Sequence, residues 1–340
     1  TMELTTVWFA LIAVLWVGYF CLEGFDFGVG MLLPVLSRSE TERRVMINTI
    51  GPVWDGNEVW VLVAGGATFA AFPEWYATLF SGFYLPLLLI LVALIVRGLS
   101  FEYRHKREDD AWKGRWDLAI IWGSFVPALL WGVAFANIVA GVPIDADKEF
   151  TGTLLTLLNP YGLLGGLVTL TLFATHGAMF VALKTDGDIR HRARSLAVRI
   201  GAAAAVLAVV FLAWTQAKTG TTASAVVFVL AALSLVGGLL AALRGREGWA
   251  FVGTFATIGL AVIGLFTALF PDVMPSTTDP AFSLTTTNAA ATAYTLEVMT
   301  WVALVFTPIV LGYQAWTYWV FRRRIAVHHI PTPVLADAPR

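Results

Sequence analysis

The sequence predicts an all-α integral membrane protein with nine transmembrane helices, an outer N-terminus and a cytoplasmic C-terminus. Three observations lead to this prediction: an apolar composition, nine apolar runs of membrane-spanning length, and basic loops that alternate between the two sides. Of the 340 residues, 58% are apolar and 13% are charged, and the mean hydropathy is +0.75. Because a soluble domain carries about 25% charged residues, this composition excludes a water-soluble enzyme and a disordered chain.

The expected spans follow from length, since a membrane-crossing helix needs about 20 mostly apolar residues. The first run lacks a small-residue cleavage site, so we expect a permanent helix and not a signal peptide. The nine spans lie near residues 5–36, 50–72, 75–101, 116–140, 158–183, 196–215, 223–243, 249–270 and 294–320. They form one transmembrane domain, residues 1–325, and the segment 326–340 is expected to be a loose cytoplasmic tail.

The basic residues of the loops predict the orientation. The odd-numbered connections and the C-terminal segment hold 19 of the 22 Lys and Arg residues, whereas the even-numbered connections hold only Lys148 and Lys218. Cytoplasmic loops carry the excess of Lys and Arg, so the N-terminus is expected outside the cell and the C-terminus inside. The near balance of 22 basic and 23 acidic residues indicates no nucleic-acid partner.

A weak internal sequence similarity suggests two four-helix units followed by a ninth, peripheral helix. The first span contains Glu23-Gly24-Phe25-Asp26, and a basic stretch follows it. The fifth span contains Thr175-His176-Gly177-Ala178, and a second basic stretch follows that span. Two units that each begin in this way, plus one further helix, account for the nine expected spans.

Five ionisable residues fall within the expected spans: Glu23, Asp26, Asp55, Glu58 and Arg97. Each charge at a helix centre costs about 2.5–3.5 kcal/mol on insertion scales. Glu23 and Asp26 are three residues apart, as are Asp55 and Glu58, so each pair shares one face of its helix. We expect neither face to point at lipid, because mutual pairing, protonation or a protein partner must offset the cost.

These charges are expected in the cytoplasmic half of the membrane. At about 1.5 Å per residue, Asp26 lies about 15 Å from the end of its span at Leu36, and Asp55 lies about 10 Å from Asn48. Arg97 lies one turn before the cytoplasmic end of the third span. A buried carboxyl near a cation can hold a proton reversibly, so we interpret the group as a proton path. A purely structural pairing is the alternative, and the sequence does not say whether Asp55 or Asp26 is the essential carrier.

The chain offers few ligands for redox groups. Cys21 is its only cysteine, which excludes an internal disulfide and an iron–sulfur cluster. His176 is the only histidine within an expected span, and Met179 on the same helix cannot face it across a haem, so we expect a hydrogen-bonded core histidine. No His/Cys cluster predicts a copper or zinc site. We therefore expect no haem, no metal and no catalytic residue in this chain.

Several motifs follow one another along the chain. The two longest are the run from Glu23 to Gly30, EGFDFGVG, and the run from Gly51 to Trp60, GPVWDGNEVW. The others are TERR at 41–44 with Asn48, AGGA at 64–67, FSGFY at 80–84, RGLSFEYR at 97–104, WGSFVP at 122–127, LNPYGL at 158–163 and MTWV at 299–302. These motifs resemble subunit II of cytochrome bd-type quinol oxidases, from about residue 7 to residue 325.

The resemblance implies a place in a terminal oxidase of the bacterial plasma membrane. Such a complex oxidises a membrane quinol, reduces O2 to water and contributes to the proton motive force. Its haems b and d and its quinol site belong to the haem-bearing subunit I. Subunit II packs against subunit I as a pseudo-symmetric partner, is needed for assembly, and brings cytoplasmic protons toward the O2-reducing haem.

The resemblance also implies roles for individual residues. Asp55, beside Trp54, matches the main station of the proton path, with Asp26 and Arg97 close by. The remaining members of the expected path are Glu23 and Glu58. A further three residues are expected to contact the partner or a neighbouring helix, namely Trp54, Asn57 and Trp60.

Two other functions compete with this interpretation. Charged residues within spans and a possible repeat are also typical of a stand-alone secondary transporter. A transporter would have helices broken near the midplane, but no acid or Arg lies beside Pro86, Pro127 or Pro308. A pure scaffold, whose acids serve only subunit docking, is the third possibility. The sequence leaves open which quinone is used, whether O2 passes through this subunit, whether a structural quinone or a small accessory subunit is present, and which helices face lipid.

Overall fold

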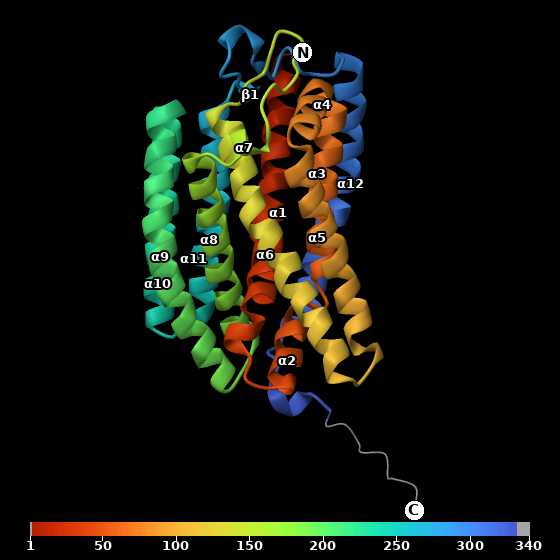
Figure 1. The fold of residues 1–340 in the computed structure, drawn as a ribbon, viewed down its shortest axis with the longest axis vertical. Coiled ribbons are helices and arrows are strands. Elements are labelled where there is room, and N and C mark those ends of the chain that lie inside the picture. The colour runs from red at the N-terminus through yellow and green to blue at the C-terminus, as the bar shows by residue number, and fades with distance from the viewer. Residues whose placement is uncertain (1, 332–340) are drawn as a thin grey trace, which may run out of the picture.

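Long helices run side by side along the molecule in the computed structural model, which describes residues 2–331 (Figure 1). Eight helices of this described part are long and apolar enough to cross a membrane. They are α1 (Met2–Leu36), α5 (Tyr84–Tyr103), α6 (Asp110–Ala140), α8 (Pro160–Lys184), α9 (Asp188–Thr219), α10 (Thr222–Leu243), α11 (Glu247–Leu269) and α12 (Ala293–Val320). The predicted all-α membrane class is confirmed.

The second predicted span, 50–72, differs most from expectation. It begins with the end of α2 (Glu40–Ile50), continues through a turn, and then forms α3 (Trp54–Ala71). The 18-residue α3 runs along α1, but it is not among the eight apolar helices. Its first five residues, WDGNE, include two acids and an asparagine, which lower the hydropathy of the whole helix.

The third predicted span, 75–101, is interrupted near the end of the bundle at which α1 begins. It consists of α4 (Pro73–Gly82) and α5, with Phe83 between them. The ring of Pro86 lacks an N–H and would clash with the carbonyl of Gly82 in a continuous helix. The chain therefore ends α4 at Gly82 and begins α5 at Tyr84.

The helix α1 lies at the centre of the bundle and packs on α3, α6, α8 and α11. Its closest approach is to α8, where Gly28 faces Gly177. A Cβ added to Gly177 would lie 2.4 Å from the Cα of Gly28, and a Cβ added to Gly28 would lie 2.0 Å from the carbonyl oxygen of Phe173. The two helices therefore touch through their backbones, which only small residues allow.

The helices form two groups of four on either side of this contact. One group contains α1, α3, α5 and α6, and the other contains α8, α9, α10 and α11. The last helix, α12, lies along α1 and α3, and only 6% of its apolar window is buried. The expected two four-helix units stay a prediction, because α1 and α6 also pack closely on α8.

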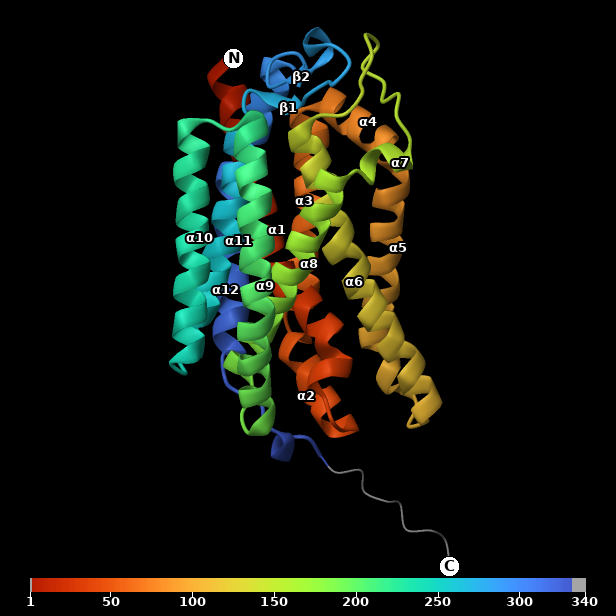
Figure 2. The same ribbon diagram turned by 60° about the vertical axis from the view of Figure 1, so that its left-hand side comes forward.

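Short elements cover both ends of the bundle. At the end where α1 begins, β1 (Asp272–Met274) pairs antiparallel with β2 (Leu284–Thr285), and α7 (Leu154–Leu157) and η2 (Pro280–Phe282) accompany them (Figure 2). At the other end lie α2, η1 (Arg104–Lys106) and η3 (Val327–His329) (Figure 1). We call these the β1 end and the α2 end.

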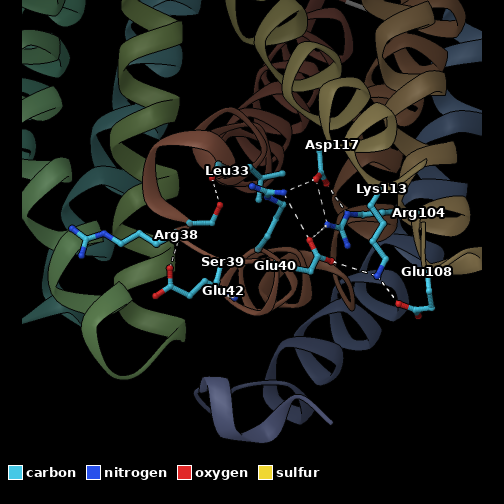
Figure 3. A network of polar contacts seen from close by, with 11 residues as sticks. Leu33, Arg38, Ser39, Glu40, Glu42, Arg104, Glu108, Lys113 and Asp117 are labelled. Carbon is cyan, nitrogen blue, oxygen red and sulfur yellow. Dashed lines mark hydrogen bonds and ion pairs between the residues drawn. The ribbon is translucent and has the colours of Figure 1, made fainter. Parts of the chain in front are cut away.

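A network of charged side chains fastens α2 to η1, which follows α5, and to α6 (Figure 3). Asp117 of α6, only 5% exposed, accepts hydrogen bonds from Nε of Arg104 at 2.6 Å and from Nη1 of Arg43 at 3.1 Å. The Arg104 guanidinium also donates to Glu40 of α2 at 2.8 Å. Asp117 therefore has the central position of this network.

Replacing Asp117 by Asn is expected to destabilise the protein by about 1–3 kcal/mol, because Arg104 and Arg43 lose a largely buried carboxylate partner. The thermal unfolding midpoint of the detergent-purified protein measures the effect. Asp110→Asn, at the exposed start of α6, is the matched control and should leave the midpoint unchanged. Equal midpoints for the two variants would contradict a structural role for the network.

The opposite face of α2 is held by α9. Glu42 accepts hydrogen bonds from Nη2 of Arg192 at 2.7 Å and from the backbone N–H of Arg38 at 2.6 Å. Burial opposes the charge of Glu42, but the hydrogen bond from Arg192 and its positive charge lower the pKa of this carboxyl below its ordinary value. Ion pairs therefore hold α2 on two faces, one toward α6 and the other toward α9.

The chain after α12 folds back onto the end of α8. Nζ of Lys184 donates to the carbonyl oxygens of Phe321 and of Arg323, the latter at 2.7 Å. Nη1 of Arg324 donates to the carbonyls of Ala182 at 2.9 Å and Thr185 at 2.7 Å. We call residues 321–325 the C-terminal strap. The expected loose tail, 326–340, begins with the buried Ala326 and with η3, and its last nine residues lie outside the described part.

Candidate functional site

Three of the predicted site residues meet in the half of the bundle near the α2 end. Glu23 lies on α1, Glu58 on α3 and Arg97 on α5, six residues before the end of that helix. Nη2 of Arg97 contacts Oε1 of Glu23 and lies 2.9 Å from Oε2 of Glu58. The Glu23 and Arg97 side chains are fully buried, whereas the Glu58 side chain is 22% exposed. One cation therefore joins the acids of two helices.

Aromatic rings and a glycine surround the arginine. Its guanidinium lies 4.7 Å from the ring centre of Phe27 and 5.8 Å from that of Phe101. Gly123 of α6 packs against it, since a Cβ there would lie 2.7 Å from the Cβ of Arg97. Its Nε and Nη1 have no hydrogen-bond partner in the described part of the chain. Cation–π contact and ion pairing are the interactions that offset the cost of burying this charge.

Asp26, one helical turn after Glu23, binds a different partner. The Nδ2 of Asn57 on α3 donates to Oδ2 of Asp26 at 2.7 Å, and both side chains are fully buried. The other oxygen of Asp26, Oδ1, is buried without a hydrogen-bond partner among the described residues. Asp26 is thus held by one oxygen only.

Residues of α12 complete this contact. The hydroxyl of Tyr318 donates to Oδ1 of Asn57 at 2.6 Å, and Nε2 of Gln314 lies 3.4 Å from the same oxygen. Nε1 of Trp60 donates to Oε1 of Gln314 at 2.8 Å. Sequence reasoning missed Tyr318 and Gln314. Their spacing of four residues within an apolar helix is the signal that could have found them.

Asp55 occupies a different environment from the other acids. It lies in the first turn of α3 and is exposed at the surface of the chain. The expected depth of Asp55 was counted along one helix from Asn48, but α2 ends at Ile50 and the chain turns before α3 begins. Glu58, one turn further along α3, is intermediate in exposure between the exposed Asp55 and the buried Asn57.

The two tryptophans of this segment pack within the chain. The indole of Trp54 lies 4.9 Å from the ring of Phe101 on α5, next to Gly98. The indole of Trp60 covers Gly18 of α1, where a Cβ would lie 2.2 Å from it. These contacts hold α3 against α5 and α1, so the tryptophans position the acids between them.

His176 is a hydrogen-bonded core residue. Its Nε2 lies 2.9 Å from the carbonyl oxygen of Cys21, and its Nδ1 lies 2.7 Å from the hydroxyl of Thr254. A carbonyl only accepts, so Nε2 carries the proton and Nδ1 accepts from Thr254. The ring also stacks on Phe251 at 4.6 Å. With both nitrogens engaged, this side chain does not fit the role of a haem ligand.

A nearly apolar cavity of about 330 Å³ lies between α6 and the helices α8 to α11, away from the charged residues. Among its lining residues are Phe135 of α6, Phe211 of α9 and Phe228 of α10. The described residues contain no cluster of His, Cys, Asp and Glu that could hold a metal ion. The cavity therefore suits an apolar chain and offers no ligands for a metal.

Comparison with known proteins shows which family has this sequence. The family model of cytochrome bd terminal oxidase subunit II matches residues 4–321. Cytochrome bd ubiquinol oxidase subunit 2 of Bacillus subtilis is 44% identical over 329 residues, which cover 95% of this chain and 97% of that protein. Cytochrome bd-I ubiquinol oxidase subunit 2 of Escherichia coli K12 is 39% identical over 365 residues, which cover 95% of this chain and 96% of that protein.

The fold itself has a solved counterpart. A chain of the bd oxidase from Geobacillus thermodenitrificans superimposes with a TM-score of 0.79 at 15% identity, over 94% of this chain and 98% of that one. The family match spans nearly the whole sequence and includes all five charged residues of the spans. The chain therefore belongs to the cytochrome bd terminal oxidase subunit II family and is a multi-pass subunit of this oxidase complex in the bacterial plasma membrane.

Proposed function

We propose that the chain is the haem-free subunit II of a quinol:O2 oxidoreductase. It supports assembly with subunit I, which holds haems b and d, and it supplies a proton path from the cytoplasm toward the O2-reducing haem. The observation that carries this proposal is the convergence of Glu23, Glu58 and Arg97, with Asp26 beside them, within helices of a membrane protein. Intramembrane charges of this kind mark ion pathways more often than simple packing.

The proposed path needs nine crossings, with the N-terminus outside and the α2 end facing the cytoplasm. Three observations support this topology: the 19 basic residues on one side against two on the other, α3 running along α1, and the start of α1 and the end of α12 at opposite ends of the bundle (Figure 1). With this topology, the acids of α1 and α3 lie in the cytoplasmic half of the membrane.

Each residue has a distinct part in the proposed path. Asp55 is exposed on a membrane helix, so it faces the partner subunit, where a charge is better solvated than in lipid. Glu58 lies one turn away and is partly exposed, so it can pass a proton between Asp55 and the interior. Asp26 can take a proton on its unpartnered Oδ1. Arg97 balances the negative charge of Glu23 and Glu58.

The absence of a haem in this chain is supported by His176, whose two ring nitrogens are both engaged. The haems supply the electron transfer and the reduction of O2 when bound in subunit I. A structural quinone in subunit II would find an apolar enclosure in the cavity between α8 and α11.

Replacing Asp55 by Asn tests the path. We expect quinol-oxidase turnover to fall by about tenfold or more, because a proton-transfer group is lost, while the haem absorption of the purified complex stays unchanged. Glu102→Gln, an exposed acid on α5 at the same end of the bundle, is the matched control and should keep full turnover. Full turnover of Asp55→Asn would overturn the path, and loss of the complex would make Asp55 a docking acid.

A secondary transporter is less well supported. Transporters of this size place their sites where helices are broken near the midplane. Here α6 continues through Pro127 and α12 continues through Pro308. The buried charged residues instead lie within α1 and α5, which are continuous through them, in the half of the bundle near the α2 end.

A further inference from the structure

A chain of amide groups connects α12 to Asp26. It begins at Trp60, whose indole N–H can only donate a hydrogen bond. Its acceptor, 2.8 Å away, is therefore the oxygen Oε1 of Gln314, and the amide nitrogen Nε2 of Gln314 must point the other way. That nitrogen lies 3.4 Å from Asn57, so the atom of Asn57 that faces it is an oxygen.

The orientation of Asn57 follows from its neighbours on α12. Its Oδ1 faces two donors, the amide of Gln314 and the hydroxyl of Tyr318, the latter at 2.6 Å. Its Nδ2 consequently faces Asp26 and donates to Oδ2 at 2.7 Å. If the side-chain amide of Asn57 were rotated by 180°, its NH2 group would face the NH2 group of Gln314, and its oxygen would face the carboxylate of Asp26. Hydrogen bonds would then be lost on both sides.

We propose that Trp60, Gln314 and Tyr318 are positioning residues, which hold Asn57 with its N–H toward Asp26. One carboxylate oxygen of Asp26 is then always occupied by a donor. The other oxygen, Oδ1, is buried without a partner and is the atom that takes up and releases the proton. This inference rests on the proposed function, because it assigns the control of Asp26 within that proton path to α12.

Near the β1 end, α12 is held by Nε1 of Trp8 on α1, which donates to the Leu296 carbonyl at 3.3 Å and to the Thr300 hydroxyl at 3.1 Å. Near the α2 end, the structure gives α12 little else besides the contact with Asn57 and Trp60. Only 6% of its apolar window is buried, and its neighbours are α1 and α3. The C-terminal strap, which begins three residues after Tyr318, is fixed to α8 by Lys184 and Arg324. By fixing the end of α12, the strap sets the position of Tyr318 and Gln314 along the helix axis, next to Asn57.

The test combines two single variants and their double variant in the intact oxidase complex. Gln314→Leu and Tyr318→Phe each leave one donor on Oδ1 of Asn57, and the double variant leaves none. We expect each single variant to lower kcat by about two- to tenfold with an unchanged KM for quinol, and the double variant to lower it further. Tyr313→Phe, whose side chain is 68% exposed on the same helix, is the matched control.

A spectroscopic readout separates positioning from packing. The carboxyl band of Asp26 is assigned in redox-difference infrared spectra as the band that Asp26→Asn removes. We expect the double variant to shift this band, because the hydrogen bond to Oδ2 changes, and Tyr313→Phe to leave it in place. Haem absorption reports whether each complex is assembled.

The outcomes distinguish this inference from the proposed function. Unchanged kcat and an unchanged carboxyl band in the double variant, with turnover lost in Asp26→Asn, would overturn the positioning role alone. Full turnover of Asp26→Asn would instead show that the proton path does not use this carboxyl. Loss of haem absorption already in both single variants would make Gln314 and Tyr318 assembly residues and would also overturn the inference.

Discussion

Replacing Arg97 by Met is expected to prevent stable assembly of the oxidase complex. The guanidinium is fully buried and contacts the carboxylates of Glu23 and Glu58. Without it, Glu23 is left as a buried acid with no cation beside it. Removing one partner of a buried ion pair costs about 3–5 kcal/mol, which is a large share of the about 5–15 kcal/mol that stabilises a typical folded protein.

The measurement for Arg97→Met is the haem absorption of solubilised membranes, together with the amount of the tagged chain. Arg115→Met, an exposed arginine on α6, is the matched control and should assemble normally. The double variant Glu23→Gln/Arg97→Met should recover part of the loss, because the uncompensated carboxylate is then absent. Normal assembly of Arg97→Met would show that the buried ion pairs contribute little to stability.

Replacing Gly28 by Ala is expected to disrupt the centre of the bundle. The new Cβ would lie 2.0 Å from the carbonyl oxygen of Phe173 and 2.7 Å from the Cα of Gly177. These are backbone atoms, so they can yield only if α1 and α8 move apart. Overpacking in a tight core costs about 1–3 kcal/mol and more where the backbone must shift.

The thermal midpoint and the yield of the purified complex measure the effect of Gly28→Ala. Gly237→Ala on α10 is the matched control, because no atom lies within 4 Å of the Cβ it would add. Alanine is the better helix former by about 1 kcal/mol, so the control should be neutral or slightly stabilising. A midpoint for Gly28→Ala equal to that of the control would mean that α1 and α8 can separate at little cost.

Much of the fold could be predicted from the sequence because the membrane imposes one strong rule. Apolar runs of sufficient length become helices, and eight of the expected spans correspond to helices that meet this criterion. The segment 50–72 was harder, because WDGNE at the start of α3 lowers its hydropathy. Gly51-Pro52 is a turn signal at the break between α2 and α3, but the run was interpreted as one helix. Pro86 also gave a signal for the break at Phe83, and that run was likewise interpreted as one helix.

The candidate site was predicted in part. The spacing of Glu23 and Asp26 put both on one face, and Arg97 was expected nearby. The structure brings Arg97 to Glu23 and Glu58, while Asp26 binds Asn57 instead. Helical spacing fixes which residues share a face, but packing between helices decides which face turns inward, so the exposure of Asp55 could not be predicted. For the same reason, Gln314 and Tyr318 were not predicted as members of the site.

The C-terminal strap has a practical consequence for protein engineering. Five residues beyond α12 hold that helix to α8 through backbone carbonyls, and these bonds depend on where the chain runs, not only on side-chain identity. Fusion of a fluorescent protein or an affinity tag directly after α12 would replace the strap and release the helix. Attachment after residue 331 keeps the strap in place, so labels intended to report on the native subunit belong there.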